Sequence, residues 1–186
     1  DSVRLVVPAP IHLPSYRDAL ERGWSPDNVN GWAAALRELD WIDRAPRDFL
    51  FALDDPQARG APLTLPDGTT RPRLPSVRRW LWDGAFCGSI GLRWQPGTER
   101  LPAHVLGHIG FAIVPWKRGH GLAAWALTAL LPYARTQGLR HIEITTDPDN
   151  IAAQKTIERC GGRLVERSSG RGHHSGMAIL RFRIDL

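Results

Sequence analysis

The sequence is poor in cysteine, with Cys87 and Cys160 the only two among 186 residues. Two cysteines cannot build a disulfide framework, and neither belongs to a CxxC or CxxH pattern, so the sequence does not indicate a zinc ribbon or a dithiol redox centre. We interpret both as small apolar residues of the interior. This use of cysteine fits a reducing compartment, and we expect a cytoplasmic protein.

Long apolar runs are also lacking. No stretch approaches the run of ~20 apolar residues that crosses a bilayer, and the first residues do not have the order of a signal peptide. We therefore expect no membrane association. Hydrophobic residues still make up 42% of the chain, which is enough for the core of one domain at this length.

Lysine is nearly absent, because Lys117 and Lys155 are the only two and all other side-chain cations are arginines. Charge is unevenly distributed: residues 1–55 carry a net charge of −4 and residues 56–186 a net charge of +9. This polarity favours an anionic ligand on the later part of the chain, with uneven surface charge of no functional meaning as the alternative. Basic and aromatic residues do not alternate in a recognised binding motif, so we expect no nucleic-acid partner.

We predict one domain over residues 1–186, of the α/β (α+β) class. Residues 1–55 are predicted to form a short strand and helices, and residues 54–76 contain five prolines that indicate a loop. Residues 77–186 are predicted to be the ligand-binding core. Within the first part we expect a strand at 3–7 and helices at about 14–22, with Ser15 as the N-cap, and 30–42.

The later part begins with strands. Residues 77–94 contain two β-rich runs joined at Asp83-Gly84, a dipeptide typical of tight hairpin turns. A third run at 104–114 completes a predicted antiparallel meander. The remaining predicted elements are a buried helix at 121–136, a strand at 139–146, a helix at 151–160 and closing strands at 163–167 and 177–184. The helix at 121–136 connects the strand before it to the strand after it as a crossover. These two strands are therefore predicted to be parallel in one mixed sheet.

The stretch "VPWKRGHGLAA", which begins at Val114, joins the meander to the buried helix. Gly119 and Gly121 allow a sharp turn and the close approach of a ligand. The first N–H groups of a helix have no partners within the helix and lie at the positive end of its dipole, so they favour an anion. Lys117 and Arg118 add charge nearby. We predict that this turn binds a pyrophosphate.

Three nucleotide motifs compete for this turn. A P-loop requires Gly-Lys-Ser/Thr, which is missing. "GHGLAA" reads as the dinucleotide fingerprint G-x-G-x-x-A, and Glu143 lies at about the position of a ribose-binding acid, but "PWKR" separates the turn from its strand and an antiparallel meander precedes it. The third pattern, R-x-x-G-x-A, is satisfied by Arg118, Gly121 and Ala123. A glycine turn that binds nothing is the plain alternative.

Together with their surroundings, these residues resemble the GNAT superfamily of acyl-CoA-dependent N-acyltransferases. The resemblance covers about residues 77–186 through "GHIGFAIVPWKRGHGLA", "HIEITTD" and "DNIAAQKTIERCGG". The earlier segment "LVVPAPIHLPSYRDALERGWSPDN" resembles bacterial proteins described only as predicted acetyltransferases. The resemblance implies a mixed, mostly antiparallel central sheet flanked by helices, with a parallel strand pair that splays apart where coenzyme A binds.

The resemblance also implies a binding site for acetyl-CoA or coenzyme A as co-substrate, and no metal. The turn would hold the pyrophosphate through backbone amides, and the strand before it would pair with the pantetheine arm as if with another strand. An asparagine that opens the later helix would contact the same arm. The cofactor-binding residues implied are Ala112, Ile113, Val114, Arg118, Gly119, His120, Gly121, Leu122, Ala123 and Asn150.

The sequence departs from the family pattern at two positions. Many members carry a tyrosine where this chain has Ile157, and its hydroxyl can protonate the departing thiolate. The aromatic residue that commonly follows the helix-ending glycine is replaced by Gly162. The general acid is therefore not identified by the resemblance.

An amine must be uncharged to attack a thioester, so a group in the site has to accept a proton near neutral pH. Several GNAT families have a glutamate at the position of His108, and imidazole has a suitable unperturbed pKa of ~6.5. We predict His108 as the general base, with a sheet histidine that satisfies a backbone group as the alternative. His104 is a weaker candidate, and Glu143 is predicted to face either the opposite side or the base of the cleft. His173 and His174 are interpreted as a solvated loop.

The sequence thus predicts an enzyme that transfers an acetyl or other acyl group from acyl-CoA to a primary amine. The acceptor is expected to be a small molecule or a peptide, and its identity is not legible in the sequence. A CoA-binding protein without catalysis is the alternative, because the tyrosine is missing. We expect a monomer or a homodimer.

Overall fold

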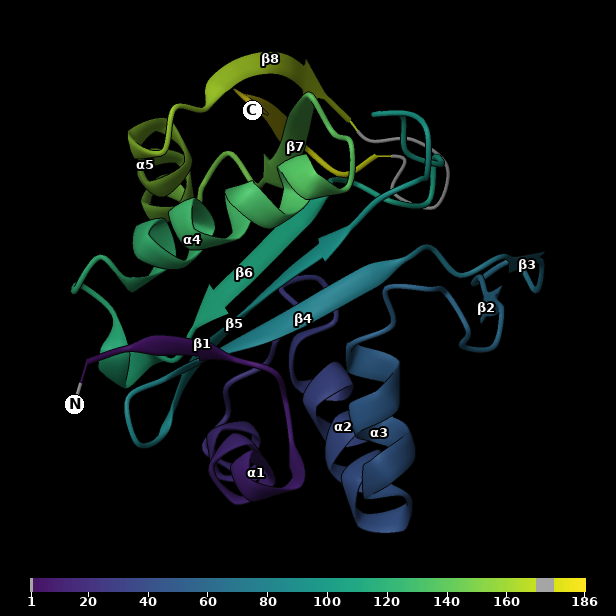
Figure 1. Ribbon diagram of the computed structural model, residues 1–186, viewed down its shortest axis with the longest axis vertical. Coiled ribbons are helices and arrows are strands. Elements are labelled where there is room, and N and C mark those ends of the chain that lie inside the picture. The colour runs from purple at the N-terminus through teal and green to yellow at the C-terminus, as the bar shows by residue number, and fades with distance from the viewer. Residues whose placement is uncertain (1, 170–175) are drawn as a thin grey trace.

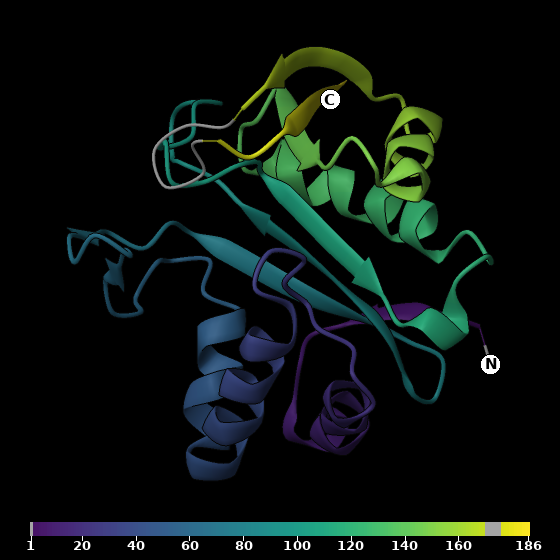
Figure 2. The ribbon, with the colours of Figure 1, turned by 180° about the vertical axis from the view of Figure 1, so that it is seen from behind.

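The computed structural model describes residues 2–169 and 176–186. Two β-sheets form its centre, with helices α1–α3 on one side and α4 and α5 on the other (Figure 1). The reverse view shows the same separation of the helices (Figure 2). The helices are α1 (Leu13–Glu21), α2 (Gly31–Arg44), α3 (Pro46–Leu53), α4 (Leu122–Thr136) and α5 (Ile151–Arg159), with 3₁₀ turns η1 (Pro10–His12) and η2 (Pro115–Lys117).

The larger sheet has the strand order β1-β4-β5-β6, and the smaller has the order β7-β9-β8. Neighbouring strands within each sheet are antiparallel. A third, two-stranded sheet pairs β2 with β3 inside the predicted loop at 54–76. The strands are β1 (Arg4–Val6), β2 (Leu63–Thr64), β3 (Thr70–Arg71), β4 (Ser76–Trp82), β5 (Phe86–Arg93), β6 (Ile109–Ile113), β7 (His141–Thr146), β8 (Arg163–Ser168) and β9 (Ile179–Asp185).

The larger sheet separates two hydrophobic clusters, because successive side chains of a strand point to opposite faces. Trp80 on β4 packs under α1–α3, where its ring stacks on Tyr16 with centroids 4.2 Å apart. Leu81, the next residue, belongs to the cluster under α4. We call these two sides the α1–α3 face and the α4 face. Residues two apart on a strand share a face, so the face of a polar side chain follows from its position in the strand.

The first part of the chain differs from the sequence prediction in two respects. Ser15 is not a helix cap, since α1 begins at Leu13 and the Ser15 hydroxyl accepts a hydrogen bond from the Phe86 N–H of β5 at 2.8 Å. The helix α3 was not predicted, because its eight residues follow α2 after Ala45 alone and are too few to show a helical period. Pro46 at its first position fits a helix start.

The predicted meander is confirmed as β4, β5 and β6. The hairpin between β4 and β5 turns through Asp83-Gly84-Ala85, where Gly84 has a φ of 107°. The third strand is shorter than the predicted run at 104–114, since β6 begins at Ile109.

The two strands joined by the crossover α4 do not share one sheet, contrary to the prediction from sequence. β6 lies in the larger sheet and β7 in the smaller. The His108 N–H, just before β6, donates to the Glu143 carbonyl of β7 at 2.8 Å, and no ladder pairing follows in the described residues. The crossover predicts only that the strands run in the same direction. The two sheets therefore meet at His108 and leave the rest of the β6 edge without a strand partner.

The end of the chain agrees with the predicted helix and two strands. Asn150 caps α5, Gly161 follows it with a φ of 91°, and β8 and β9 close the smaller sheet. His173 and His174 lie outside the described residues. Among the helices described, none combines the length and apolar character that a bilayer crossing requires.

Candidate functional site

The turn before α4 presents a row of backbone donors. Gly119 and Gly121 have φ values of 82° and 73°, a conformation that favours glycine, and Gly121 is the N-cap of α4. Within the described residues, the N–H groups of residues 119–124 donate no hydrogen bond. They lie at the N-terminus of a 15-residue helix, where the dipole adds to their attraction for negative charge. The turn can therefore hold an anion through its backbone.

The cationic side chains beside the turn are already engaged. The Nε of Arg118 donates to the Ile113 carbonyl at 3.1 Å, and the Nδ1 of His120 lies 2.8 Å from the Arg118 carbonyl. The Nζ of Lys117 lies 2.5 Å from a carboxylate oxygen of Asp83, and this hydrogen bond raises the pKa of Lys117. Lys117 therefore anchors the turn to the β4–β5 hairpin. The sequence analysis had predicted a free charge at this position.

A second anchor holds the 3₁₀ turn η2 in place. The guanidinium of Arg22, just after α1, lies over the ring of Trp116 at 3.5 Å from its centroid. A cation over an aromatic face is attracted by the ring's quadrupole. The glycine turn before α4 is thus held by contacts with α1 and the β4–β5 hairpin, both remote from it in sequence.

The sequence-predicted cofactor residues gather around the gap between the two sheets. Ala112, Ile113 and Val114 lie at the end of β6, whose outer edge pairs with no strand in the described part of the chain, and Arg118–Ala123 follow after η2. Asn150 lies at the start of α5, where its Oδ1 accepts the Ala153 N–H at 3.0 Å. The capping role of Asn150 is present, and its amide nitrogen makes no hydrogen bond within the described part of the chain.

His108 lies between the two sheets and is fully buried. Its Nδ1 accepts the Glu143 N–H at 2.9 Å, so the neutral ring carries its proton on Nε2, which has no partner in the described residues. Burial lowers the pKa of His108 to about 4, and the neighbouring Glu143 charge opposes that shift without cancelling it. The ring is therefore uncharged at neutral pH, and the lone pair of Nδ1 is occupied.

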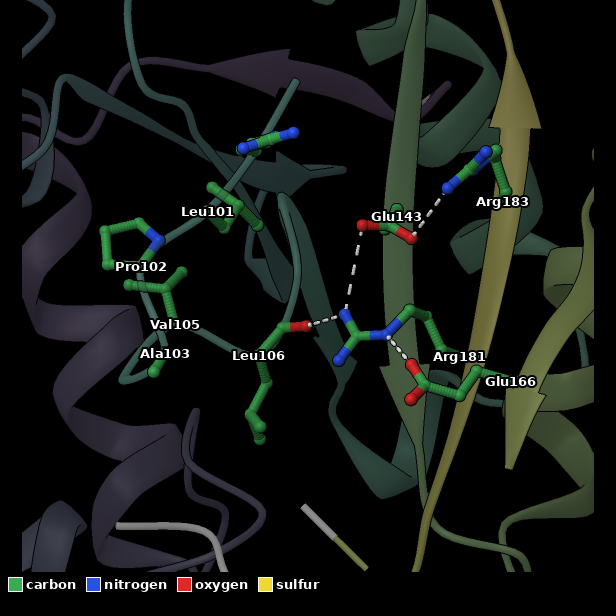
Figure 3. A pocket seen from close by; sticks show the side chains of 10 residues that line it. Leu101, Pro102, Ala103, Val105, Leu106, Glu143, Glu166, Arg181 and Arg183 are labelled. Atoms are coloured by element: carbon green, nitrogen blue, oxygen red, sulfur yellow. Dashed lines mark hydrogen bonds and ion pairs between the residues drawn. The ribbon is translucent and has the colours of Figure 1, made fainter. Parts of the chain in front are cut away.

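A cavity of about 450 Å³ lies on the same face as Glu143, beside the sheet β7-β9-β8. Glu143 lies between two arginines of β9, with Arg183 at 3.4 Å and Arg181 at 3.9 Å (Figure 3). Arg181 also pairs with Glu166 at 2.8 Å and donates to the Leu106 carbonyl. The residues lining the cavity are Arg100, Leu101, Pro102, Ala103, Val105, Leu106, Glu143, Glu166, Arg181 and Arg183. Ile142 and Ile144, on either side of Glu143, are buried in the cluster under α4, so Glu143 points to the opposite side of β7, the first of the two predicted orientations.

Further polar side chains lie on the α1–α3 face. The hydroxyl of Tyr16 donates to Glu38 at 2.5 Å, and burial raises the pKa of Glu38, whereas the nearby Arg78 lowers it. Arg78 on β4 and Arg93 on β5 share this face with Trp80. Sequence analysis missed these residues. The alternation of cationic and apolar residues in "SVRRWLW" and "ILRFRID" was the available signal, since it places the arginines of a strand on one face.

Ile157 is fully buried in the cluster under α4, where a Cβ on Gly162 would come within 2.4 Å of it. The two departures from the family pattern are therefore packed against each other. In the part of the chain that is described, no three His, Cys, Asp or Glu side chains converge as a metal site requires.

Comparison with protein families gives one match. Residues 14–163 match the family model described as the acetyltransferase (GNAT) domain. No curated protein matches the chain.

Solved structures with the same fold cover nearly all of the chain. One is the acetyltransferase from Salmonella typhimurium that modifies the N-terminal serine of a 50S ribosomal subunit protein, with 14% identity, a TM-score of 0.66 and coverage of 100% of this chain and 95% of that one. The ribosomal α-N-protein acetyltransferase RimL, in complex with coenzyme A, has 12% identity, a TM-score of 0.64 and coverage of 100% and 95%. A microcin self-immunity acetyltransferase, in complex with acetyl-CoA and AMP, has 12% identity, a TM-score of 0.64 and coverage of 100% and 93%. At these identities the likeness establishes the fold.

Proposed function

The chain belongs to the GNAT acetyltransferase family, and from this premise we propose that it transfers an acetyl group from acetyl-CoA to the primary amine of an acceptor. The observation that carries the proposal is the row of N–H groups at residues 119–124, which have no partners in the described residues and precede α4. A diphosphate supplies the acceptor oxygens that such donors lack. The site residues therefore fit coenzyme A.

The position of each group in the site suggests which part of coenzyme A it would bind. The amides of residues 119–124 would hold the diphosphate, while the open edge of β6 offers N–H and C=O groups to the two amides of the pantetheine arm. Asn150 would add an amide donor at the start of α5. When bound, acetyl-CoA supplies a thioester carbonyl that an uncharged amine can attack. The protein's remaining task is to place the amine and accept its proton.

His108 remains our sequence-based candidate for accepting that proton, and two observations count against it. Its Nδ1 already accepts the Glu143 N–H, and its pKa of about 4 makes it a weak base at neutral pH. Glu38 is a second candidate, because burial raises its pKa and it lies on the α1–α3 face near Arg78.

The two candidates can be separated with His108→Gln and Glu38→Gln. If Glu38 accepts the proton, Glu38→Gln lowers kcat by roughly a hundredfold, the scale of general base catalysis, and the affinity for coenzyme A is unchanged. Tyr16→Phe is the control, since it removes the hydrogen bond to Glu38 but not the carboxylate. Loss of turnover in His108→Gln alone, with CoA affinity retained, assigns the role to His108.

The function itself is tested in two steps. Calorimetry with coenzyme A measures binding, and release of free thiol from acetyl-CoA in the presence of a panel of amines measures transfer. We expect both heat and amine-dependent thiol release. Binding without thiol release would favour the alternative, a CoA-binding protein without catalysis, and no binding would end both proposals.

Two further predictions concern the protein in the cell and in solution. We propose a cytoplasmic location and a monomer or homodimer. Cell fractionation and light scattering after size-exclusion chromatography measure these properties.

A further inference from the structure

Arg78 and Arg93 are neighbours on the α1–α3 face. Arg78 of β4 lies opposite Gly91 of β5, and Arg93 is two residues further along β5, so both side chains point to the same side of the sheet. The guanidinium of Arg78 lies close to the Gly91 backbone, since a Cβ built there would be 3.2 Å from its Cζ. Glycine at this position lets the guanidinium approach the strand.

Neither arginine has a carboxylate partner. Arg78 donates to the hydroxyl of Ser89 at 3.2 Å, and Arg93 donates to the carbonyl of Gly107 at 2.8 Å. Among residues 2–169 and 176–186, neither forms an ion pair with an acid, and Glu38 accepts its hydrogen bond from the Tyr16 hydroxyl. A guanidinium has five N–H donors, so most of the donors of both side chains have no acceptor.

The two positive charges also repel each other. Surrounding protein atoms lower the pKa of Arg93 to about 10, and the charge of Arg78 contributes to that shift. Arg93 is nevertheless accessible to solvent. A ligand from solvent can therefore reach the Arg93 guanidinium and supply a counter-charge. With a pKa of about 10, Arg93 remains protonated at neutral pH.

The sheet surface between this pair and β6 carries glycines on the facing positions of β5 and β6. Gly91 pairs with Gly110 of β6, and a Cβ on Gly110 would meet no atom within 4 Å. Gly110 precedes the end of β6 along which we place the pantetheine arm. Strands are about 4.8 Å apart, so the arginines lie roughly 5 to 10 Å across the sheet from the β6 edge.

We propose that Arg78 and Arg93 together bind an oxyanion, a carboxylate or a phosphate, that the acceptor amine itself carries. This inference rests on the proposed acetyltransferase function and names its substrate class: amines with an anionic group a few bonds from the nitrogen. Guanidinium groups pair with such oxyanions through charge-assisted, often bidentate hydrogen bonds. Amines without an anionic group would leave most of the N–H donors of the two guanidinium groups without an acceptor, although the charge of Glu38 lies near Arg78.

The test compares matched acceptors that differ in one charge. ω-Amino acids from β-alanine to 6-aminohexanoate are titrated by calorimetry against their amides, and O-phosphoethanolamine against ethanolamine, each with and without coenzyme A. We expect the anionic member of one series to bind roughly tenfold more tightly, as a charge-assisted hydrogen bond predicts. The series that shows the preference distinguishes carboxylate from phosphate.

Arg78→Gln and Arg93→Gln are expected to abolish that preference. Arg44→Gln is the control, because Arg44 pairs with Asp40 at the exposed end of α2 and should leave the preference intact. Equal binding of the charged and neutral members, or a preference that survives both substitutions, would overturn the proposal. If a variant does not fold by circular dichroism, the comparison of acceptors on the unaltered protein decides.

The outcome is separable from that of the proposed function. If coenzyme A does not bind and no amine releases thiol, the acetyltransferase proposal fails, and with it the assignment of the oxyanion to an acceptor. If acetyl transfer is observed while charged and neutral amines have equal kcat/KM, the function stands and the arginine site is wrong.

Discussion

At the scale of single residues, Gly121 and Gly138 form a matched pair at opposite ends of α4. Both have positive φ, 73° and 87°, and both have open space where a Cβ would lie. Alanine at either position should therefore destabilise the fold by a similar amount, about 1 to 2 kcal/mol, because the left-handed conformation is strained for a residue with a side chain.

Their effects on ligand binding should differ. Gly121→Ala is expected to weaken coenzyme A binding by roughly tenfold, since it disturbs the donors at residues 119–124. Gly138→Ala should leave the affinity unchanged. Thermal unfolding and calorimetry measure the two quantities, and an equal loss of affinity in both variants would contradict the position of the anion site.

His108 provides a pH-dependent prediction. Its pKa is about 4 in the folded protein and 6.5 in the unfolded chain. Between these values the unfolded chain binds a proton that the folded protein does not, so the free energy of unfolding falls as the pH falls from 6.5 towards 4. The contribution of this one residue is about 3 kcal/mol.

Urea unfolding at several pH values measures this slope. His108→Gln should flatten the decline in the free energy of unfolding between pH 6.5 and 4. His120→Gln, at an exposed position in the turn, should leave it as it is. A decline that is identical in all three proteins would show that the pKa of His108 is the same in the folded and unfolded states.

At the scale of elements, α1 is joined to β5 by the hydroxyl of Ser15, which accepts the Phe86 N–H. Ser15→Ala would leave that buried N–H without a partner, at a cost of about 1 to 3 kcal/mol in the free energy of unfolding. Thr136→Ala is a suitable control, because the Thr136 hydroxyl is exposed and its two partners, the Tyr133 carbonyl and the Gln137 side-chain amide, are local to the end of its own helix. Chemical denaturation compares the two, and equal losses would rule out a specific role for Ser15.

At the scale of the whole molecule, charge is divided along the chain. Residues 56–186 carry a net charge of +9 and hold the proposed site for a multiply charged anion. The dissociation constant for coenzyme A should therefore rise between about 0.05 M and about 0.5 M salt, as screening shortens the range of the attraction. Dephospho-CoA, which lacks one phosphate, should show a weaker dependence in the same titration. A dissociation constant independent of salt would indicate that the uneven charge has no part in binding.

The sequence by itself determined the order of the later elements and the glycine turn before α4. These features depend on local chemistry: the glycines at 119 and 121 permit the turn, the apolar run sets the buried helix, and Asn150 caps the next one. The hairpin at Asp83-Gly84 has the same local origin. Helix α3 was missed because eight residues contain too little periodic signal.

Only the tertiary structure decided which side chains meet. His108 meets the Glu143 N–H where the two sheets adjoin, and the free donors of Arg78 and Arg93 depend on where every acidic residue lies. The engagement of Lys117 by Asp83 likewise joins positions 34 residues apart. A sequence records residue types and their local spacing, whereas the pKa of a buried ring and the pairing of a cation are set by neighbours that folding brings together from distant segments.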